Sequence, residues 1–342
     1  MSNYFTLTED QKRTVITQTA NKIGLPVQAV EKDLWVTVFL QIVFSLPIAE
    51  YLIFKGGTSL SKVWNLIERF SEDIDLAIDR RYFGYEGDLS KKQIKVLRKK
   101  SSLFVRDELC KAIQDEVRKL GLDNYCIVDS EPDGEGDNTY PEPRKIYIRY
   151  KSLFGENNAY LAQTILLEVG ARSLIEPTEI RKVQSLITQS FPIESAIADA
   201  NIITSVPAKT FLEKAFLLHE LFSTGGGLIA DRKSRHLYDL EKMMDHDFAQ
   251  NAINDDELWN SIHHHREIFT AMKDVDYSPD IRERICLIPP ENVIEHWRKD
   301  YETMQGSMIH GESLNFEELI QRISNLSQQF KAREPREDQQ IV

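Results

Sequence analysis

Hydrophobic and polar positions divide the chain into a part that mixes strands with helices and a part that is helical. Short runs with apolar residues at alternate positions, or wholly apolar, predict strands at 51–55, 74–79, 126–128, 145–150 and 164–169. Longer stretches with a period of three to four residues predict helices at 8–23, 26–46, 58–67 and 89–120. From Pro207 to about Phe330 only the helical period remains. The pattern therefore predicts an α+β fold in which a sheet domain precedes a helical domain.

Capping residues and prolines set the expected element boundaries. Thr8 followed three residues later by Gln11 resembles a capping box that opens the first helix. Pro26 suits the start of the second helix, and Pro47 stops it. We expect an N-terminal helix at 1–25, an α/β domain at 26–190, a helical domain at 191–330 and a polar flexible tail at 331–342.

A glycine-rich turn follows the apolar strand at 51–55. Gly56 and Gly57 allow backbone N–H groups to approach a phosphate closely, and Thr58 and Ser59 can cap the next helix and donate hydroxyl groups. The N-terminus of such a helix favours an anion. The motif is not a Walker A loop, because no Gly-Lys-Ser or Gly-Lys-Thr closes it.

Two aspartates lie one short helix after the turn. Asp73 and Asp75 share one face of a strand because side chains alternate, while Ile74 packs on the other face. Two carboxylates this close repel each other unless a cation lies between them. A glycine turn alone is usually only a turn, and an Asp-x-Asp pair is usually a solvated strand end. Their order and spacing together predict a metal–nucleotide site.

The motifs resemble those of the AbiEii/AbiGii-type nucleotidyltransferase toxin family of type IV toxin–antitoxin systems. The matching segments are 30–35, 54–62, 69–76, 210–215, 218–219, 234–240, 300–304 and 311–316. The resemblance spans about residues 28–330 and implies a nucleotidyltransferase-type mixed β-sheet domain. It also implies an enzyme that moves a nucleoside monophosphate from a nucleoside triphosphate to an acceptor. The acceptor within this family can be a tRNA, another RNA or a protein, and RNA such as tRNA is our first choice. A separately encoded antitoxin would neutralise it.

Nucleotidyl transfer of this kind uses carboxylates to hold Mg²⁺, with two ions expected. Asp73 and Asp75 are the expected catalytic metal ligands, because hard carboxylate oxygens suit Mg²⁺. In this fold superfamily a third carboxylate comes from a neighbouring strand, and Glu168, in the middle of an apolar strand, is the candidate. The alternative is a structural ion pair of Glu168 with Arg172 or Arg149.

We expect the second half of the chain to supply the positive charge that a triphosphate needs. Lys214 lies on a largely apolar helix face, so it either extends to solvent or contacts a phosphate, and the resemblance favours the phosphate. Arg235 and Asp239 are four residues apart and could form an ordinary helix ion pair. The resemblance instead implies that Arg235 binds the nucleotide and that Asp239 orients Lys214 or Arg235. Lys62, which closes the glycine motif, is also an expected nucleotide contact.

The net charge of −12 argues against a protein that coats nucleic acid. One segment is an exception, since 91–100 contains six lysine and arginine residues. They form either a solvated helix face or a contact with the RNA backbone.

The remaining composition indicates a soluble protein in a reducing compartment, and we expect the cytoplasm. Cys110, Cys126 and Cys286 are widely spaced and fit no metal-ligand pattern. The N-terminus lacks the pattern of a secretion signal. The most apolar run, 34–46, is too short to span a membrane.

Two other functions remain open. One is a housekeeping nucleotidyltransferase without toxicity, and the other is a non-catalytic module that binds a nucleotide or a protein on the same fold. The intact Asp73–Asp75 pair and glycine turn weigh against the second.

Overall fold

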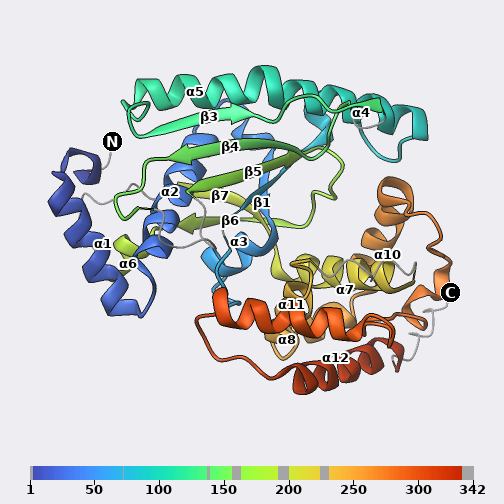
Figure 1. The fold of residues 1–342 in the computed structure, drawn as a ribbon. Coiled ribbons are helices and arrows are strands. Elements are labelled where there is room, and N and C mark those ends of the chain that lie inside the picture. The colour runs from blue at the N-terminus through green and yellow to red at the C-terminus, as the bar shows by residue number, and fades with distance from the viewer. Residues whose placement is uncertain are drawn as a thin grey trace, which may run out of the picture. The chain divides into compact units, whose positions relative to one another are not determined.

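The computed structural model describes residues 3–71, 73–136, 139–155, 163–191, 200–223 and 231–332. The chain forms two compact units, Met1–Val206 and Pro207–Val342 (Figure 1). The first unit combines a sheet with helices, and the second is helical in its described residues. The predicted α+β fold is therefore confirmed.

Two helices open the first unit. After the short 3₁₀ helix η1 (Asn3–Thr6), α1 (Glu9–Ile23) begins with the predicted capping box between Thr8 and Gln11. α2 (Val27–Phe44) begins directly after Pro26, as predicted. Figure 1 shows α1 and α2 packed side by side, and α2 also packs across β5 and β7 of the sheet.

The sheet of the first unit has seven strands in the order β3-β4-β5-β2-β1-β7-β6. β2 runs parallel to β5 and β1 runs parallel to β7, whereas the other neighbours are antiparallel. The sheet is therefore mixed, as expected. The strands are β1 (Leu52–Lys55), β2 (Ile74–Ile78), β3 (Cys126–Ser130), β4 (Arg144–Tyr150), β5 (Thr164–Gly170), β6 (Thr178–Val183) and β7 (Ala200–Ser205).

Shorter helices connect the strands. The α3 helix (Gly56–Lys62) is shorter than the predicted 58–67, since the chain soon leaves the helical region and Asn65 has a φ of 52°. The predicted helical stretch 89–120 comprises α4 (Lys91–Phe104), a π-helical turn η4 (Val105–Leu109) and α5 (Cys110–Lys119). The other short helices are η2 (Ala49–Tyr51), η3 (Arg80–Phe83) and α6 (Leu186–Ser190).

Strands β6 and β7 were not predicted from the sequence. β6 is an edge strand and most of it is exposed, with Ile180 at 70% exposure, so it lacks the alternation that marks a half-buried strand. β7 falls in the range 191–330 that was expected to be helical, yet it pairs with β1 through Phe54 and Thr204. The first compact unit therefore extends to Val206.

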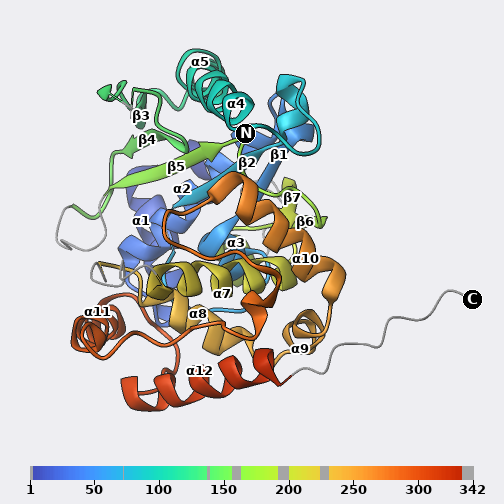
Figure 2. The same cartoon turned by 90° about the vertical axis from the view of Figure 1, so that its right-hand side faces the viewer.

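The second unit contains the helices predicted from Pro207 onward. Its core contains large apolar side chains such as Phe211, Phe216 and Trp297, none of which is measurably exposed. In Figure 2, α7 lies beside α8 and α12 packs against α8. The elements are α7 (Pro207–Ser223), α8 (Arg235–Met243), α9 (Asp247–Ile253), α10 (Asp256–His265), η7 (Arg266–Thr270), η8 (Pro279–Arg282), α11 (Ile294–Ser307) and α12 (Phe316–Lys331). Residues 333–342 of the expected tail lie outside the described residues.

None of the helices in the described part of the chain is both long enough and apolar enough to span a membrane. The three cysteines form no disulfide. Burial raises the pKa of the Cys110 and Cys126 thiols to about 11, so both are protonated at neutral pH.

Candidate active site

Four charged residues form a row across the centre of the sheet, which we call the charge row. Lys55 of β1 is in register with Asp75 of β2, Asp75 is in register with Glu168 of β5, and Glu168 is in register with Lys145 of β4. Residues directly opposite each other on paired strands share one face of the sheet. Their strand neighbours on the opposite face are buried: Phe54, Ile74, Leu76, Leu167, Val169, Arg144 and Ile146.

The two carboxylates at the centre of the charge row affect each other electrostatically. Burial raises the pKa of Glu168, and repulsion from Asp75 raises it further. Lys145, whose Nζ lies 3.6 Å from Glu168 Oε1, and Lys55 act in the opposite direction. The net direction is upward, so two ionised carboxylates at this position are costly without a further cation.

The two alternative partners considered for Glu168 were wrong. Arg172 pairs with Glu142, whose carboxylate also accepts hydrogen bonds from the backbone after β5. Arg149 pairs with Asp129 at 2.7 Å. Arg149 lies on the same face of β4 as Lys145, four residues farther along the strand. A lysine of the charge row therefore takes the place that the sequence analysis assigned to an arginine.

Asp73 lies just before β2, where α3 holds the chain. The Thr58 hydroxyl donates to the backbone oxygen of Asp73 and lies 2.9 Å from Ser71 Oγ. Ser59 is completely buried, and its hydroxyl donates to the Gly56 carbonyl oxygen at 3.0 Å. Both hydroxyls that were expected to bind the nucleotide are thus bonded within the protein, where they shape the turn and the start of β2.

The glycines of the turn make room for neighbouring side chains. Gly56 has a φ of 77°, and a Cβ atom there would lie 2.0 Å from Oδ2 of Asp75. A Cβ on Gly57 would lie 2.6 Å from Nη2 of Arg69. The positive φ at position 56 favours glycine, and at both positions a side chain would crowd a charged group, the Asp75 carboxylate or the Arg69 guanidinium. Gly56 therefore leaves room for the carboxylate of an expected metal ligand.

Lys62 lies at the end of α3 in a mostly buried ion pair with Asp33 of α2. The second carboxylate oxygen of Asp33 accepts a hydrogen bond from the backbone N–H of Leu186 at 2.7 Å. Lys62 therefore ties α3 to α2 and, through Asp33, to the start of α6. This contact gives Lys62 a structural role, and its expected contact with a nucleotide stays a prediction.

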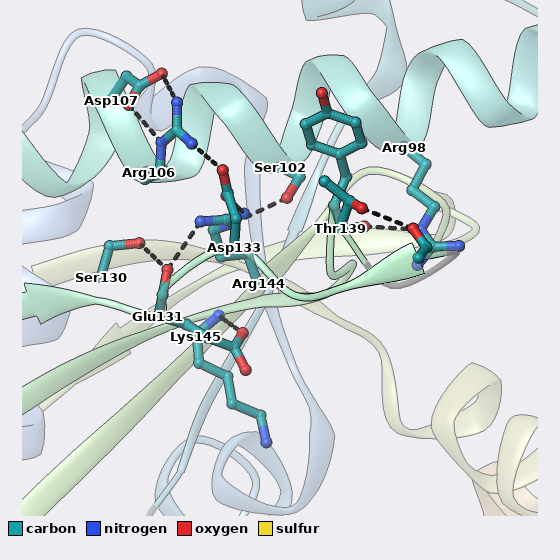
Figure 3. Close-up of polar contacts among 12 residues, drawn as sticks. Arg98, Ser102, Arg106, Asp107, Ser130, Glu131, Asp133, Thr139, Arg144 and Lys145 are labelled. Carbon is teal, nitrogen blue, oxygen red and sulfur yellow. Dashed lines mark hydrogen bonds and ion pairs between the residues drawn. The ribbon is translucent and has the colours of Figure 1, made fainter.

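A polar network holds the start of β4, which carries Lys145 (Figure 3). The buried Arg144 donates to the Ser102 hydroxyl at 2.9 Å, to the Glu131 carbonyl oxygen at 2.8 Å and to the Asp133 carboxylate at 2.5 Å. The Lys145 backbone N–H donates to the Glu131 carboxylate at 3.2 Å. These contacts fix the register that places Lys145 beside Glu168. Lys55 and Lys145 were not predicted from the sequence, since only strand pairing places Lys55 beside Asp75 and Lys145 beside Glu168.

In the second unit, Lys214 of α7 and Asp239 of α8 form a buried ion pair at 2.9 Å. Nδ1 of His236 lies 3.4 Å from the same ammonium group. The contact between Lys214 and Asp239 is one of the two that the sequence analysis proposed for this aspartate. Arg235 is half-buried and makes no ion pair with any residue that the structure describes.

Asp300 and His219, which lie in other segments that resemble the family's motifs, form hydrogen bonds within the second unit. The Asp300 carboxylate accepts hydrogen bonds from the backbone N–H groups of Arg232 at 2.7 Å and Ser234 at 2.9 Å, which fixes the start of α8. Nδ1 of His219 accepts from the backbone N–H of Cys286 at 3.1 Å, and burial lowers the pKa of this imidazole. His219 is thus a buried histidine with a satisfied hydrogen bond.

The described residues contain no group of three or more His, Cys, Asp or Glu side chains placed to hold a metal ion. Asp75 and Glu168 nevertheless present hard carboxylate oxygens on paired strands. Mg²⁺ in phosphoryl-transfer sites needs only one or two carboxylates, because substrate phosphates and water complete its coordination. The donor set of the charge row therefore fits Mg²⁺.

Comparisons with known proteins identify the family. A family model described as "Nucleotidyl transferase AbiEii toxin, Type IV TA system" matches residues 40–322. No curated protein matches the chain. Among solved structures, the chain is similar to MenT4, a nucleotidyltransferase toxin from Mycobacterium tuberculosis, with a TM-score of 0.53 and 16% identity over 96% of this chain and 91% of that chain. This likeness supports the fold. Because the family model covers most of the sequence, the protein belongs to the AbiEii nucleotidyltransferase toxin family of type IV toxin–antitoxin systems.

Proposed function

We propose that this nucleotidyltransferase uses Mg²⁺ to move a nucleoside monophosphate from a nucleoside triphosphate to an RNA acceptor such as tRNA. The observation that carries the proposal is the register of Asp75 with Glu168 at the centre of the charge row. The raised pKa of Glu168 supports it, since a bound cation would offset the repulsion between the two carboxylates.

Asp75 and Glu168, with Asp73 two residues before Asp75, would hold the metal. When bound, Mg²⁺ would activate the attacking oxygen and neutralise charge on the phosphates, and a second ion would stabilise the leaving oxygen. Gly56 leaves room for the Asp75 carboxylate beside the turn, and Lys145 forms an ion pair with Glu168. The chain's own contribution is thus to position the ligands before the substrate arrives.

Arg235 stays a proposed nucleotide contact, as the family resemblance implies. It suits this role because it is half-buried and has no carboxylate partner among the described residues. We also keep Lys214 as a proposed contact, with Asp239 holding its ammonium group in place. Gly57 and Lys62 stay proposed nucleotide contacts from the sequence motif, as do Gly56, Thr58 and Ser59.

An RNA acceptor is supported by the basic helix α4. Its lysines at positions 91, 92, 95, 99 and 100 are exposed, whereas Arg98 donates to the Tyr140 carbonyl oxygen at 2.8 Å. Exposed lysines on one helix provide charge for phosphate contacts on a protein that is otherwise acidic. Family membership further supports a separately encoded antitoxin as partner, and the cytoplasm is the proposed compartment.

A transfer assay tests the reaction. Purified protein is incubated with Mg²⁺, each α-labelled nucleoside triphosphate in turn and total tRNA, beside Asp75→Asn. Asp129→Asn is the matched control, because Asp129 is a half-exposed carboxylate on the edge strand β3. The proposal predicts label in RNA with the wild type and the control, and none with Asp75→Asn.

Other outcomes decide between acceptors and between functions. Label on protein instead of RNA would refute the RNA acceptor and leave nucleotidyl transfer intact. Equal labelling by Asp75→Asn would refute the proposed metal ligand. Expression in a host tests the toxin: arrested growth with the wild type and normal growth with Asp75→Asn are expected. Normal growth with both would favour a housekeeping enzyme.

A further inference from the structure

A cavity of about 350 Å³ lies in the first unit, and its lining contains no residue of the charge row. Its walls come from η1, α1 and α2 and from the loops that follow α5 and β4. A cavity of this volume falls in the size range of small-molecule sites. Neither the glycine turn nor the proposed Mg²⁺ ligands contribute to it, so it is separate from the proposed active site.

Lys12 of α1 is the buried cation of this cavity, with an exposed fraction of only 5%. Its ammonium group lies over three aromatic rings, with Nζ 4.7 Å from the Tyr125 ring centroid, 5.9 Å from Tyr4 and 6.0 Å from Phe5. No carboxylate among the described residues forms an ion pair with it. A buried ammonium without an anionic partner is costly, and ring faces compensate only part of that cost.

Glu31, one of the two carboxylates in the lining, is already engaged elsewhere. Glu31 of α2 is 2% exposed and accepts hydrogen bonds from the Ser152 hydroxyl at 2.5 Å and the Leu153 backbone N–H at 2.8 Å. Arg13 donates to the carbonyl oxygen of Leu153. These bonds tie α1 and α2 to the loop after β4. The cavity is therefore built before any ligand enters, and Lys12 remains available to an anion.

The aromatic walls add a second requirement for the ligand. Phe5 packs against Trp35 with ring centroids 5.5 Å apart and against Tyr125 at 6.0 Å. All three line the cavity and offer flat apolar surface. Lys151 also lines it, so the cations of the lining outnumber its acids by one. An uncharged ring would leave Lys12 unpaired, and an anion without a ring would leave the aromatic walls uncovered.

We propose that this cavity binds a small molecule that joins an anionic group to a planar ring, with the anion on the Lys12 ammonium and the ring against Phe5, Trp35 and Tyr125. A carboxylate and a phosphate share the chemistry that Lys12 recognises. The proposal does not rest on nucleotidyl transfer.

Isothermal titration calorimetry on the full chain tests the proposal. Indole-3-acetate and adenosine 5′-monophosphate serve as ring-bearing anions, acetate and inorganic phosphate as anions without a ring, and indole as a ring without charge. The first two probes separate carboxylate from phosphate ligands. We expect at least one of them to bind with a Kd below about 1 mM, and acetate, phosphate and indole to bind at least about tenfold more weakly.

Two variants assign the binding to Lys12 and to the rings. Lys12→Met keeps the apolar stem and removes the charge, and it should weaken binding about tenfold or more. Tyr125→Leu removes one aromatic wall and should weaken the ring-bearing anions alone. Lys111→Met is the matched control, because Lys111 is an exposed lysine on α5 outside the lining, and it should bind like the wild type. Thermal melting confirms that each variant is folded.

Three results would overturn the proposal. The first is that neither ring-bearing anion binds the wild type with a Kd below about 1 mM. The second is that a folded Lys12→Met variant binds the ring-bearing anions as tightly as the wild type does. The third is that acetate and phosphate bind the wild type as tightly as the ring-bearing probes do. If Lys12→Met does not fold, Tyr125→Leu and the five probes on the wild type still decide the question.

Discussion

Replacing Gly56 by alanine should disturb the Asp75 carboxylate directly. The new Cβ would lie 2.0 Å from Asp75 Oδ2, a separation that no real contact allows, and the backbone at Gly56 has a φ of 77°. The Asp75 side chain must then rotate away, or the turn must move. Either change displaces a proposed metal ligand from the centre of the charge row.

The magnitude follows from two contributions. Holding an alanine in the left-handed region costs about 1–2 kcal/mol. Forcing the Asp75 side chain away from its preferred rotamer costs about 0.5–1.5 kcal/mol more. We therefore expect Gly56→Ala to lower the free energy of unfolding by about 1.5–3.5 kcal/mol. Its transfer activity should fall about 100-fold, because small displacements of catalytic groups have effects of that size.

Gly84→Ala is the matched control. Gly84 has a φ of 78°, almost the same as Gly56, but nothing lies within 4 Å of a Cβ built there. It should lose only the backbone contribution of about 1–2 kcal/mol and keep its transfer activity. Urea unfolding followed by circular dichroism measures both stabilities, and the labelled-nucleotide assay measures activity. If Gly56→Ala is no less stable than Gly84→Ala and equally active, the turn does not position Asp75.

Three further predictions concern other parts of the molecule. Lys214→Met should lower the free energy of unfolding in urea by about 3–5 kcal/mol, since it removes the ammonium group that pairs with the buried Asp239 carboxylate, and adding Asp239→Leu should restore part of the loss. Burial lowers the pKa of His219 in the folded state, so its stabilising contribution is complete above its unfolded pKa of about 6.5 and is lost as the pH falls through lower values. His219→Asn should therefore flatten the decline of unfolding free energy as the pH falls below about 6.5. Lys91→Glu combined with Lys95→Glu should weaken tRNA binding and reduce the slope of log affinity against log salt by about 1–2, measured by fluorescence anisotropy.

Each of these has a result that contradicts it. Equal stabilities of Lys214→Met and the wild type would show that the pair with Asp239 is unimportant. An unchanged pH profile for His219→Asn would assign acid sensitivity to other groups. Unaltered salt dependence after the two charge reversals would mean that α4 is a solvated face and does not contact RNA.

Much of the fold could be predicted from the sequence because its signals are local. The capping box at Thr8 and Gln11 fixed the start of α1, and apolar runs located β1 to β5. β6 lacked a signal because an exposed edge strand needs no alternation, and β7 followed a stretch without clear periodicity. Local patterns therefore predict elements better than they predict membership in a sheet.

The candidate site was only partly predictable for a related reason. The Asp73–Asp75 motif could be read from local sequence, although Asp73 lies just before β2, whereas the placement of Glu168 between Asp75 and Lys145 depends on the pairing of β5 with two other strands. Strand register is a long-range property that one sequence does not contain. The hydroxyl of Thr58 illustrates a second limit, because residue type suggested a ligand contact while packing turned the group toward the protein's own backbone.

The central claim is that the carboxylates of the charge row hold the catalytic metal. Electron paramagnetic resonance of free Mn²⁺, titrated with protein in the presence of a non-hydrolysable nucleoside triphosphate, measures that binding without requiring turnover. The account predicts that the wild type and Asp129→Asn bind Mn²⁺ alike, that Mg²⁺ competes, and that Asp75→Asn and Glu168→Gln each weaken binding about tenfold or more. Equal Mn²⁺ binding by all four proteins would contradict it.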